Sequence, residues 1–253
     1  VAAKNGYFDM VVWLYEKNYV CSHEAVDRSA RNGHFDVVKW LVINGCEGYS
    51  CHAINWAAMN GHFEILKWLV NNPINAHLRR INSKLAEKHE YDCSVGDEDH
   101  AFTEKYCLTV CLNPMDYAPQ SGNLELVQWL HNNKVGKAND CAMNVAAKYG
   151  HVHILEWMLE KKYKKPNALP FLLAAKYGHL NVIRWLVKNH GISHKCKEIN
   201  SYPHAQGIYY AAEFNHVNVL QYLMEDCPAF VKYHALRIAV KCGSLNAIKW
   251  LCK

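Results

Sequence analysis

One group of histidine and cysteine side chains able to bind a metal lies in residues 190–204. It contains His190, His194, Cys196 and His204. Imidazole and thiolate are the ligands that tetrahedral zinc sites use. However, separations of four, two and eight residues match no familiar zinc motif, and a chain with 16 histidines contains chance groupings. We therefore expect no metal here and no cofactor elsewhere.

An acidic run at Asp97, Glu98 and Asp99 raises the question of calcium. Calcium loops of the EF-hand type need acidic or amide side chains at alternate positions followed by glycine, and this spacing is missing. The run is therefore interpreted as a solvated loop. The sequence also lacks the phosphate-binding loop, the dinucleotide fingerprint, the nucleophile elbow and the zinc-protease helix motif. We expect no enzyme.

A third group consists of histidines at regular positions, each of which follows a glycine or an asparagine. Its members are His34, His62, His151, His179 and His216. Such regularity argues against a single catalytic centre. We expect each ring to bond to the backbone of the next turn, and the regularity directs attention to the elements that carry these rings.

The surrounding phrase occurs eight times, most clearly as AAKYGHLNVIRWL at residues 174–186. Each copy has one residue, here named the turn position, at the centre of the phrase. The turn positions are Gly6, Gly33, Gly61, Gly122, Gly150, Gly178, Asn215 and Gly243. They lie 27 or 28 residues apart, except for one separation of 61 and one of 37. A fixed period between about 20 and 50 residues indicates a solenoid or array.

Two helices are expected in each copy. Apolar or small residues stand seven, four and three residues before the turn position, and apolar residues stand two, four, five, seven and eight residues after it. Both spacings place these residues on one face of a helix. Glycine ends the first, inner helix because it adopts positive φ without strain, and Asn215 is the next best residue there. The second, outer helix follows directly.

Tryptophan occupies one position of the outer helix, seven residues after the turn. Seven of the eight tryptophans fall there, namely Trp13, Trp40, Trp68, Trp129, Trp157, Trp185 and Trp250. A column of rings could serve as a stacking platform for nucleic-acid bases. We favour a packing ladder between adjacent outer helices.

The pattern of alanines, turn glycine, histidine and outer-helix apolar residues resembles the ankyrin repeat over nearly the whole chain. The resemblance implies an all-α fold, an α-solenoid of stacked helix-turn-helix repeats. The period of 28 rather than 33 residues, and the replacement of the T-P-L-H box by stretches such as HAIN, imply shortened or absent β-hairpins. Compact, tryptophan-rich copies of this kind are similar to arrays in large DNA viruses, amoebae and oomycetes.

One array is expected over residues 1–253, with about nine repeats, a degenerate copy at 80–111, and both ends apparently truncated. The chain is 51% hydrophobic and 20% charged, which excludes a disordered chain. No apolar run is long enough to span a membrane. Eleven cysteines without a CxxC pair favour free thiols in a reducing, cytoplasmic setting.

The exposed ends of the inner helices are the predicted binding site. Five of the eight residues two positions before the turn are basic, and large aromatics stand beside three of the eight. The set comprises Lys4, Arg31, Met59, Gln120, Lys148, Tyr149, Lys176, Tyr177, Glu213, Phe214 and Lys241.

Repeat arrays of this kind commonly bind partners on a concave face. We predict a monomeric, non-catalytic scaffold that binds a partner protein, with an acidic segment as the complement of the basic residues. The alternatives are nucleic-acid binding, for which a net charge of +5 is modest, and a recruiting arm or spacer of a larger protein. No membrane partner is expected.

Overall fold

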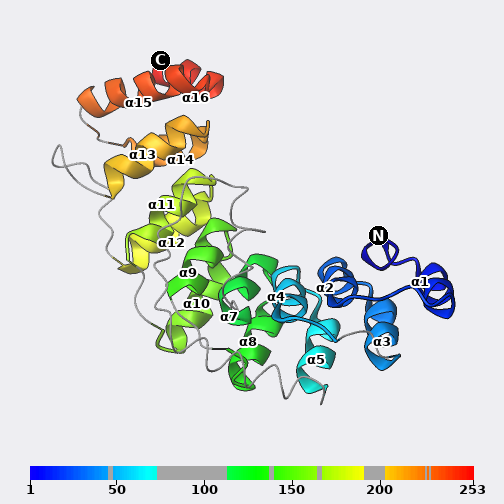
Figure 1. The fold of residues 1–253 in the computed structure, drawn as a ribbon. Coiled ribbons are helices and arrows are strands. Elements are labelled where there is room, and N and C mark those ends of the chain that lie inside the picture. Colours follow the sequence, from blue (N-terminus) through cyan, green and yellow to red (C-terminus); the bar gives the residue numbers. More distant parts are fainter. Residues whose placement is uncertain are drawn as a thin grey trace, which may run out of the picture. The chain divides into compact units, whose positions relative to one another are not determined.

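The structure is a computed structural model that describes residues 1–44, 48–72, 113–136, 140–163, 167–190, 203–225, 227 and 229–253. Every regular element within these ranges is a helix, and none is a strand (Figure 1). The all-α fold expected from the sequence is therefore confirmed. The chain forms two compact units, Val1–Ala138 and Asn139–Lys253.

The first unit stacks inner helices on inner helices. The inner row consists of η1 (Ala3–Asn5), α2 (His23–Asn32), α4 (Cys51–Met59) and α7 (Pro114–Tyr117), the last continued by η2 (Ala118–Ser121). The outer row consists of α1 (Phe8–Glu16), α3 (Phe35–Ile43), α5 (Phe63–Asn71) and α8 (Leu124–Asn132). Each inner helix packs against the next one along the chain, η1 on α2, α2 on α4 and α4 on α7.

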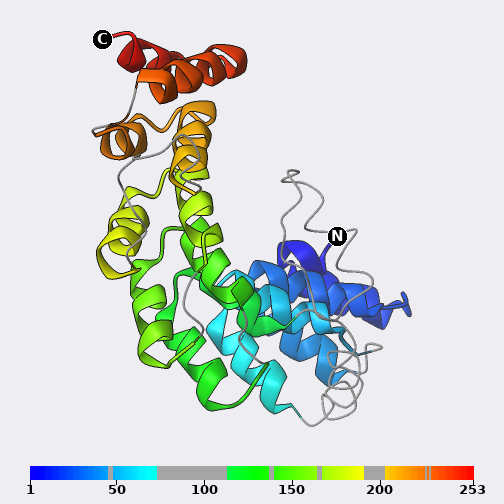
Figure 2. The same ribbon diagram turned by 90° about the vertical axis from the view of Figure 1, so that its left-hand side faces the viewer.

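The second unit repeats this arrangement. Its inner row consists of α9 (Asp140–Lys148), α11 (Leu169–Lys176), α13 (His204–Glu213) and α15 (Ala229–Cys242). Its outer row consists of α10 (Val152–Glu160), α12 (Leu180–His190), α14 (Val217–Leu223) and α16 (Leu245–Leu251). Figure 2 shows the helix pairs of this unit from a second side, stacked one after another.

The long separation between Gly61 and Gly122 does not interrupt the described stack. Helix α4 packs directly against α7 and η2, and Gly61 faces Ser121 as Gly33 faces His62. The ring of Phe63 also meets that of Trp129, with centroids 6.0 Å apart. The degenerate copy expected at 80–111 lies outside the described residues, and the repeats on either side of it are direct neighbours.

The turn between the two helices forms as the sequence predicts. Gly33 has φ of +85° and ends α2, whereas Asn215 has φ of +64° and occupies the same position in a later copy. Left-handed backbone is the conformation that glycine adopts freely and asparagine tolerates better than other residues. The Asn215 side chain also accepts a hydrogen bond from the Ala247 amide at 2.9 Å, a contact to the following repeat.

Small residues let the inner helices approach one another. Ala57 and Ala58 of α4 are fully buried, as are Ala174 and Ala175 of α11. Burial of apolar surface contributes roughly 25 cal/mol per Å². Because a methyl group separates the helices where a larger side chain would force them apart, the alanine pair sets the close spacing of the inner row.

The tryptophans take part in packing between neighbouring outer helices. An aromatic residue at the start of one outer helix meets the tryptophan of the next repeat edge-on. The ring centroids are 6.4 Å apart for Phe8 and Trp40, and 6.3 Å apart for Phe35 and Trp68. Edge-to-face pairs contribute about 0.5–1.5 kcal/mol beyond burial. The expected packing ladder is therefore confirmed for these copies.

The cysteines do not all follow the expectation of free thiols. Cys51, Cys227, Cys242 and Cys252 are free. Cys21 and Cys141, in contrast, are each disulfide-bonded. The reducing, cytoplasmic setting therefore stays a prediction.

Candidate protein-interaction site

The residues predicted to meet a partner stand at the same point of successive repeats, where the inner helix ends. In the first unit they are Lys4, Arg31, Met59 and Gln120, here named the first strip. In the second unit they are Lys148, Tyr149, Lys176, Tyr177, Glu213, Phe214 and Lys241, here named the second strip. Both strips follow from the period, because each inner helix ends one or two residues before its turn position.

The first strip is chemically mixed. Lys4 and Arg31 are exposed cations, whereas Met59 and Gln120 are half-buried and uncharged. The guanidinium of Arg31 lies 5.2 Å from the ring of Trp56, which belongs to the next inner helix. The first strip therefore has two cations followed by two neutral side chains. It lacks the alternating lysines and aromatic rings of the second strip.

The second strip holds a ladder of lysines and aromatic rings. The ammonium of Lys148 lies 5.7 Å from the ring centroid of Tyr149 and 4.8 Å from that of Tyr177. The ammonium of Lys176 lies 6.0 Å from the centroid of Tyr177 and 5.1 Å from that of Phe214. Each lysine thus rests between an aromatic ring of its own repeat and one of the following repeat.

The contacts in this ladder hold both the aromatic rings and the lysine ammonium groups in place. A cation on a ring face contributes about 0.5–1 kcal/mol at exposed sites, and here each lysine has two such contacts. Both ammonium groups flank the Tyr177 ring at 4.8 and 6.0 Å from its centroid, which places them within about 11 Å of each other. Tyr149 and Phe214 remain 38% and 40% exposed, so the ladder presents apolar surface as well as positive charge.

Two members of the predicted set stand apart from the ladder. Glu213 and Lys241 occupy the corresponding positions of their repeats, where Glu213 is half-buried and Lys241 is exposed. Neither residue belongs to the cation–ring contacts described above, which run from Tyr149 to Phe214. The structure therefore brings together Lys148, Tyr149, Lys176, Tyr177 and Phe214 within the set.

The histidines after the turn hold the backbone beneath both strips. The Nε2 atom of His34 lies 3.0 Å from the carbonyl oxygen of Lys4, that of His62 lies 3.0 Å from the oxygen of Arg31, and that of His216 lies 2.8 Å from the oxygen of Lys176. Ser244 does the same with its hydroxyl, which donates to the Glu213 carbonyl at 2.7 Å.

These contacts correct one detail of the sequence interpretation. A bond from histidine to backbone was expected and is found, but its acceptor lies in the preceding repeat rather than in the next turn. Sequence reasoning therefore missed that the histidines after the turn and the two strips are parts of one arrangement. The shared period of about 28 residues was the available signal, because any contact between repeats must recur with it.

Burial makes His179 harder to protonate. Desolvation lowers its pKa and outweighs the opposing effect of its hydrogen bond to the Lys148 backbone, while the nearby His216 lowers the pKa further. A neutral imidazole with one N–H is the form that donates to a carbonyl at neutral pH. The lowered pKa therefore favours the neutral form of His179, which makes the hydrogen bond to the backbone of Lys148 in the second strip.

A buried carboxylate links two inner helices of the first unit. Asp27 stands six residues before its turn position, where ankyrin repeats carry the histidine of the box. It accepts hydrogen bonds from the backbone amide of Ser50 at 3.0 Å and from the Ser50 hydroxyl at 2.5 Å. Burial raises the pKa of the Asp27 carboxyl, and the bonds from Ser50 partly oppose this effect.

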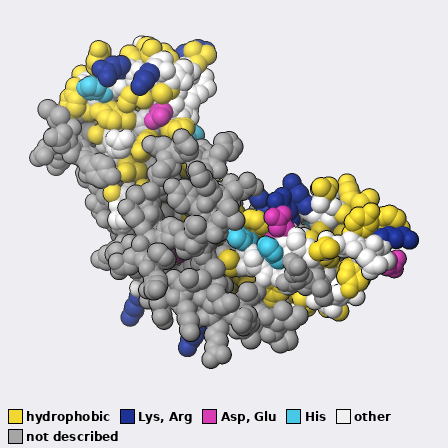
Figure 3. Space-filling model, in the orientation of Figure 1, with side chains coloured by type: hydrophobic (Ala, Val, Ile, Leu, Met, Phe, Trp, Pro, Cys, Tyr) yellow, Lys and Arg dark blue, Asp and Glu magenta, His cyan; other side chains and the backbone are white. Residues whose placement is uncertain are grey.

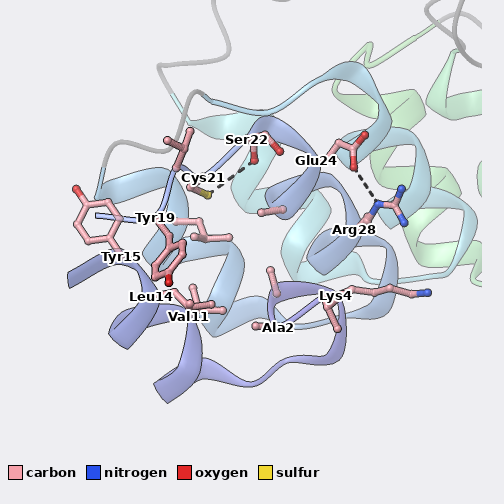
Figure 4. A pocket seen from close by; sticks show the side chains of 15 residues that line it. Ala2, Lys4, Val11, Leu14, Tyr15, Tyr19, Cys21, Ser22, Glu24 and Arg28 are labelled. Carbon is pink, nitrogen blue, oxygen red and sulfur yellow. Dashed lines mark hydrogen bonds and ion pairs between the residues drawn. The ribbon is translucent and has the colours of Figure 1, made fainter. Parts of the chain in front are cut away.

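A hollow of about 510 Å³ lies beside Lys4, between η1, α1 and the start of α2 (Figure 4). Apolar side chains such as Leu14 line it, and an ion pair between Glu24 and Arg28, 3.4 Å apart, lies at one side.

Metal binding and membrane spanning find no support in the part of the chain that the structure describes. No group of three or more His, Cys, Asp or Glu side chains in this part is arranged to hold a metal ion. No described helix is both long and apolar enough to cross a membrane. His194, Cys196 and the acidic run at 97–99 lie outside the described residues.

Comparison with known proteins agrees with the repeat geometry. A family model of ankyrin repeats, in three copies, matches residues 1–82 and 115–198. The chain belongs to the ankyrin repeat family. Ankyrin repeats generally serve as protein–protein interaction modules, and proteins built from them are typically non-catalytic. None of the curated proteins matches the chain.

Proposed function

We propose that the chain binds a partner protein through the second strip and that the partner supplies an acidic segment. The observation that carries this proposal is the ladder of Lys148 and Lys176 between the rings of Tyr149, Tyr177 and Phe214. Aromatic and cationic side chains held rigidly at a surface are typical anchors of protein interfaces. Carboxylates of the partner pair with the lysines, and apolar side chains of the partner cover the rings.

Preorganisation supports the use of this surface for binding. A free lysine side chain has about 2 kcal/mol of rotamer entropy, much of which is lost when a partner holds it. Lys176 is already ordered by two rings, and His216 holds its backbone carbonyl. Binding a rigid residue loses less entropy, so each contact contributes more to affinity.

A protein partner fits this surface better than a nucleic acid. Non-specific nucleic-acid binding depends on neutralising several phosphates at once. The net charge of the chain is only +5, and Glu213 lies within the second strip itself. We further propose that one copy of the chain suffices for this binding and that the ends of the inner helices line the concave face typical of such arrays.

The test compares a charge reversal in the strip with a matched reversal outside it. Lys148→Glu with Lys176→Glu alters the ladder, whereas Lys161→Glu with Lys162→Glu alters two exposed lysines that follow α10. The probe is a fluorescein-labelled peptide rich in glutamate, measured by anisotropy. We expect the strip variant to bind at least about tenfold more weakly than the control, because two favourable charge contacts become repulsive.

A second variant separates anchoring from net charge. Tyr177→Ala keeps both lysines but removes the ring between them, and we expect a smaller loss of several-fold. Labelled oligothymidylate provides the comparison with nucleic acid at low and moderate salt. Equal peptide affinity in the strip and control variants would overturn the proposal, as would tighter binding of the oligonucleotide than of the peptide.

A further inference from the structure

The second strip is regular in space although its repeats are unevenly spaced in sequence. Tyr149 and Tyr177 are 28 residues apart, whereas Tyr177 and Phe214 are 37 residues apart. The ammonium of Lys148 nevertheless lies 4.8 Å from the ring centroid of Tyr177. That of Lys176 lies 5.1 Å from the ring centroid of Phe214. The strip therefore presents the same pair of groups, a lysine and the ring of the following repeat, at each step from one repeat to the next.

The contacts of the lysines limit the length of one step. The rings of Tyr149 and Tyr177 lie 5.7 and 4.8 Å from the Lys148 ammonium, so their centroids are at most about 10.5 Å apart. The rings of Tyr177 and Phe214 lie 6.0 and 5.1 Å from the Lys176 ammonium, so their centroids are at most about 11 Å apart. Helix α11 packs directly on α9 and on α13, and packed helices are about 8–10 Å apart. One step of the second strip is therefore about 8–11 Å long.

Two backbone conformations of a partner segment match this step. Polyproline II has three residues per turn and a rise of about 3.1 Å, so every third side chain points the same way, about 9.3 Å further along. An α-helix returns to the same face after seven residues, or about 10.5 Å. A β-strand returns to the same face after about 6.6 Å, which is shorter than one step.

The length of the ladder favours polyproline II over the helix. From the Tyr149 ring to the Phe214 ring the ladder has two steps, which together extend over at most about 22 Å. About seven or eight residues of polyproline II cover this distance, whereas an α-helix needs about 15. Isolated helices of about 12–15 residues are marginally stable in water, but polyproline II is a major conformer of unfolded chains. An extended segment therefore loses less free energy in ordering when it binds the strip.

The charges along the strip add an order to this spacing. Lys148 and Lys176 occupy the same position of two successive repeats, and Glu213 occupies it in the third. The backbone of each is held by a hydrogen bond from a side chain of the following repeat. Figure 3 shows part of this unit near α13 and α15, where basic and acidic side chains stand among apolar ones. A segment that follows the strip therefore meets two positive charges and then a negative one.

We propose that the second strip binds a segment in the polyproline II conformation with acidic residues at its first and fourth positions and a basic residue at its seventh. The acidic residues pair with Lys148 and Lys176, and the basic residue pairs with Glu213. Uncharged residues between them cover the rings of Tyr149 and Phe214, which are 38% and 40% exposed. Proline suits these places because its ring fixes φ near the polyproline II value. This inference rests on the proposed function and adds the conformation and the charge order of the partner segment.

Three peptides of identical composition test the spacing and the charge order. EPAEPAK has both features, EPAKPAE keeps the spacing but has the basic residue in the middle, and EEPAPAK has adjacent acidic residues. Each carries fluorescein at its N-terminus and an amide at its C-terminus, and anisotropy measures its binding to the whole chain. We expect EPAEPAK to bind about tenfold more tightly than EPAKPAE, whose charge order mismatches the strip in either chain direction. We expect it to bind several-fold more tightly than EEPAPAK.

A charge reversal in the protein tests the pairing of the seventh residue. The natural chain should bind EPAEPAK more tightly than EPAEPAE, and Glu213→Lys should reverse this preference because the third charge of the strip becomes positive. The matched control is Glu225→Lys, which makes the same change of net charge at an exposed residue after α14. This control should keep the natural preference. We expect each preference to be about three- to tenfold, and circular dichroism verifies that both variants fold.

The outcomes distinguish this inference from the proposed function. Equal binding of the three peptides, all weakened by Lys148→Glu with Lys176→Glu, would retain an acid-binding strip and overturn the spacing and the charge order. No effect of that double variant on any peptide would overturn the proposed function as well. An unchanged preference in Glu213→Lys would overturn the charge order. Tighter binding of an alanine-rich helical peptide with glutamates seven residues apart would overturn the extended conformation.

Discussion

Alanine at Gly178 should destabilise the array more than alanine at Gly243, although both glycines have left-handed backbone. Gly178 has φ of +80° and Gly243 has φ of +71°. A Cβ at residue 178 would lie 2.5 Å from Nδ1 and 2.8 Å from Cε1 of His216, whereas a Cβ at residue 243 would meet nothing within 4 Å. The two positions therefore share the backbone strain and differ in the contact with histidine.

The expected losses of stability follow from the backbone strain and from the contact with histidine. Left-handed backbone costs an L-residue about 1–2 kcal/mol, and this is the whole expected loss for Gly243→Ala. At Gly178 the new methyl group also displaces the His216 ring, whose Nε2 lies 2.8 Å from the Lys176 carbonyl. Loss of that hydrogen bond costs a further 0.5–1.5 kcal/mol, roughly. We expect a total loss for Gly178→Ala of about 2–3 kcal/mol.

Urea unfolding followed by far-ultraviolet circular dichroism measures both losses. The double variant Gly178→Ala with His216→Ala isolates the contact, because without the imidazole the alanine at 178 should cost no more than the one at 243. The expected coupling between positions 178 and 216 is about 1 kcal/mol. Equal losses for the two glycine variants, or no coupling in the double variant, would refute the explanation based on the His216 contact.

Two further predictions concern a buried acid and the tryptophan column. Because burial raises the pKa of Asp27 above 3.8, the charged carboxylate is disfavoured in the fold, and its unfavourable contribution develops as pH rises from about 4 through the raised pKa. Asp27→Asn should therefore increase the free energy of unfolding at pH 7 by up to about 1 kcal/mol. In urea titrations below pH 4 the variant and the natural chain should be equally stable. A difference in stability that stays the same at both pH values would contradict this explanation. Trp157→Ala should lower the free energy of unfolding by about 3–5 kcal/mol, because Trp157 is buried. Trp13→Ala should lower it by less than about 1 kcal/mol, because the Trp13 ring is exposed. Similar losses for the two variants would contradict the packing role.

Features that recur within one repeat could be predicted from the sequence. The spacing of apolar residues placed both helices, and the requirement for positive φ identified the turn even where asparagine replaces glycine at Asn215. The tryptophans at seven of the eight copies were interpreted correctly as packing residues for the pairs that the structure shows, because a side chain that recurs with the repeat serves the stack. Each of these inferences depends on local backbone geometry and on helical periodicity.

Contacts between repeats were harder to predict. The sequence shows that His62 recurs but not that its ring reaches back to Arg31, since periodicity alone gives no direction along the stack. Lys148 and Tyr149 were noted as neighbours in sequence, whereas the closer ring to Lys148 belongs to Tyr177 in the next repeat. The direct packing of α4 on α7 was also missed, because a separation of 61 residues suggested another repeat between them.

In the second strip, Lys176 belongs both to the stack and to the proposed binding surface. Lys176 has its carbonyl held by His216 and its ammonium 5.1 Å from the Phe214 ring, and both partners belong to the following repeat. The geometry that Lys176 presents to a partner therefore requires that α13 and its turn are folded against α11. Under the proposed function, binding at the strip would in turn favour the stacked state, because a ligand that prefers one state stabilises it. The proposal therefore links stacking and partner binding thermodynamically at Lys176.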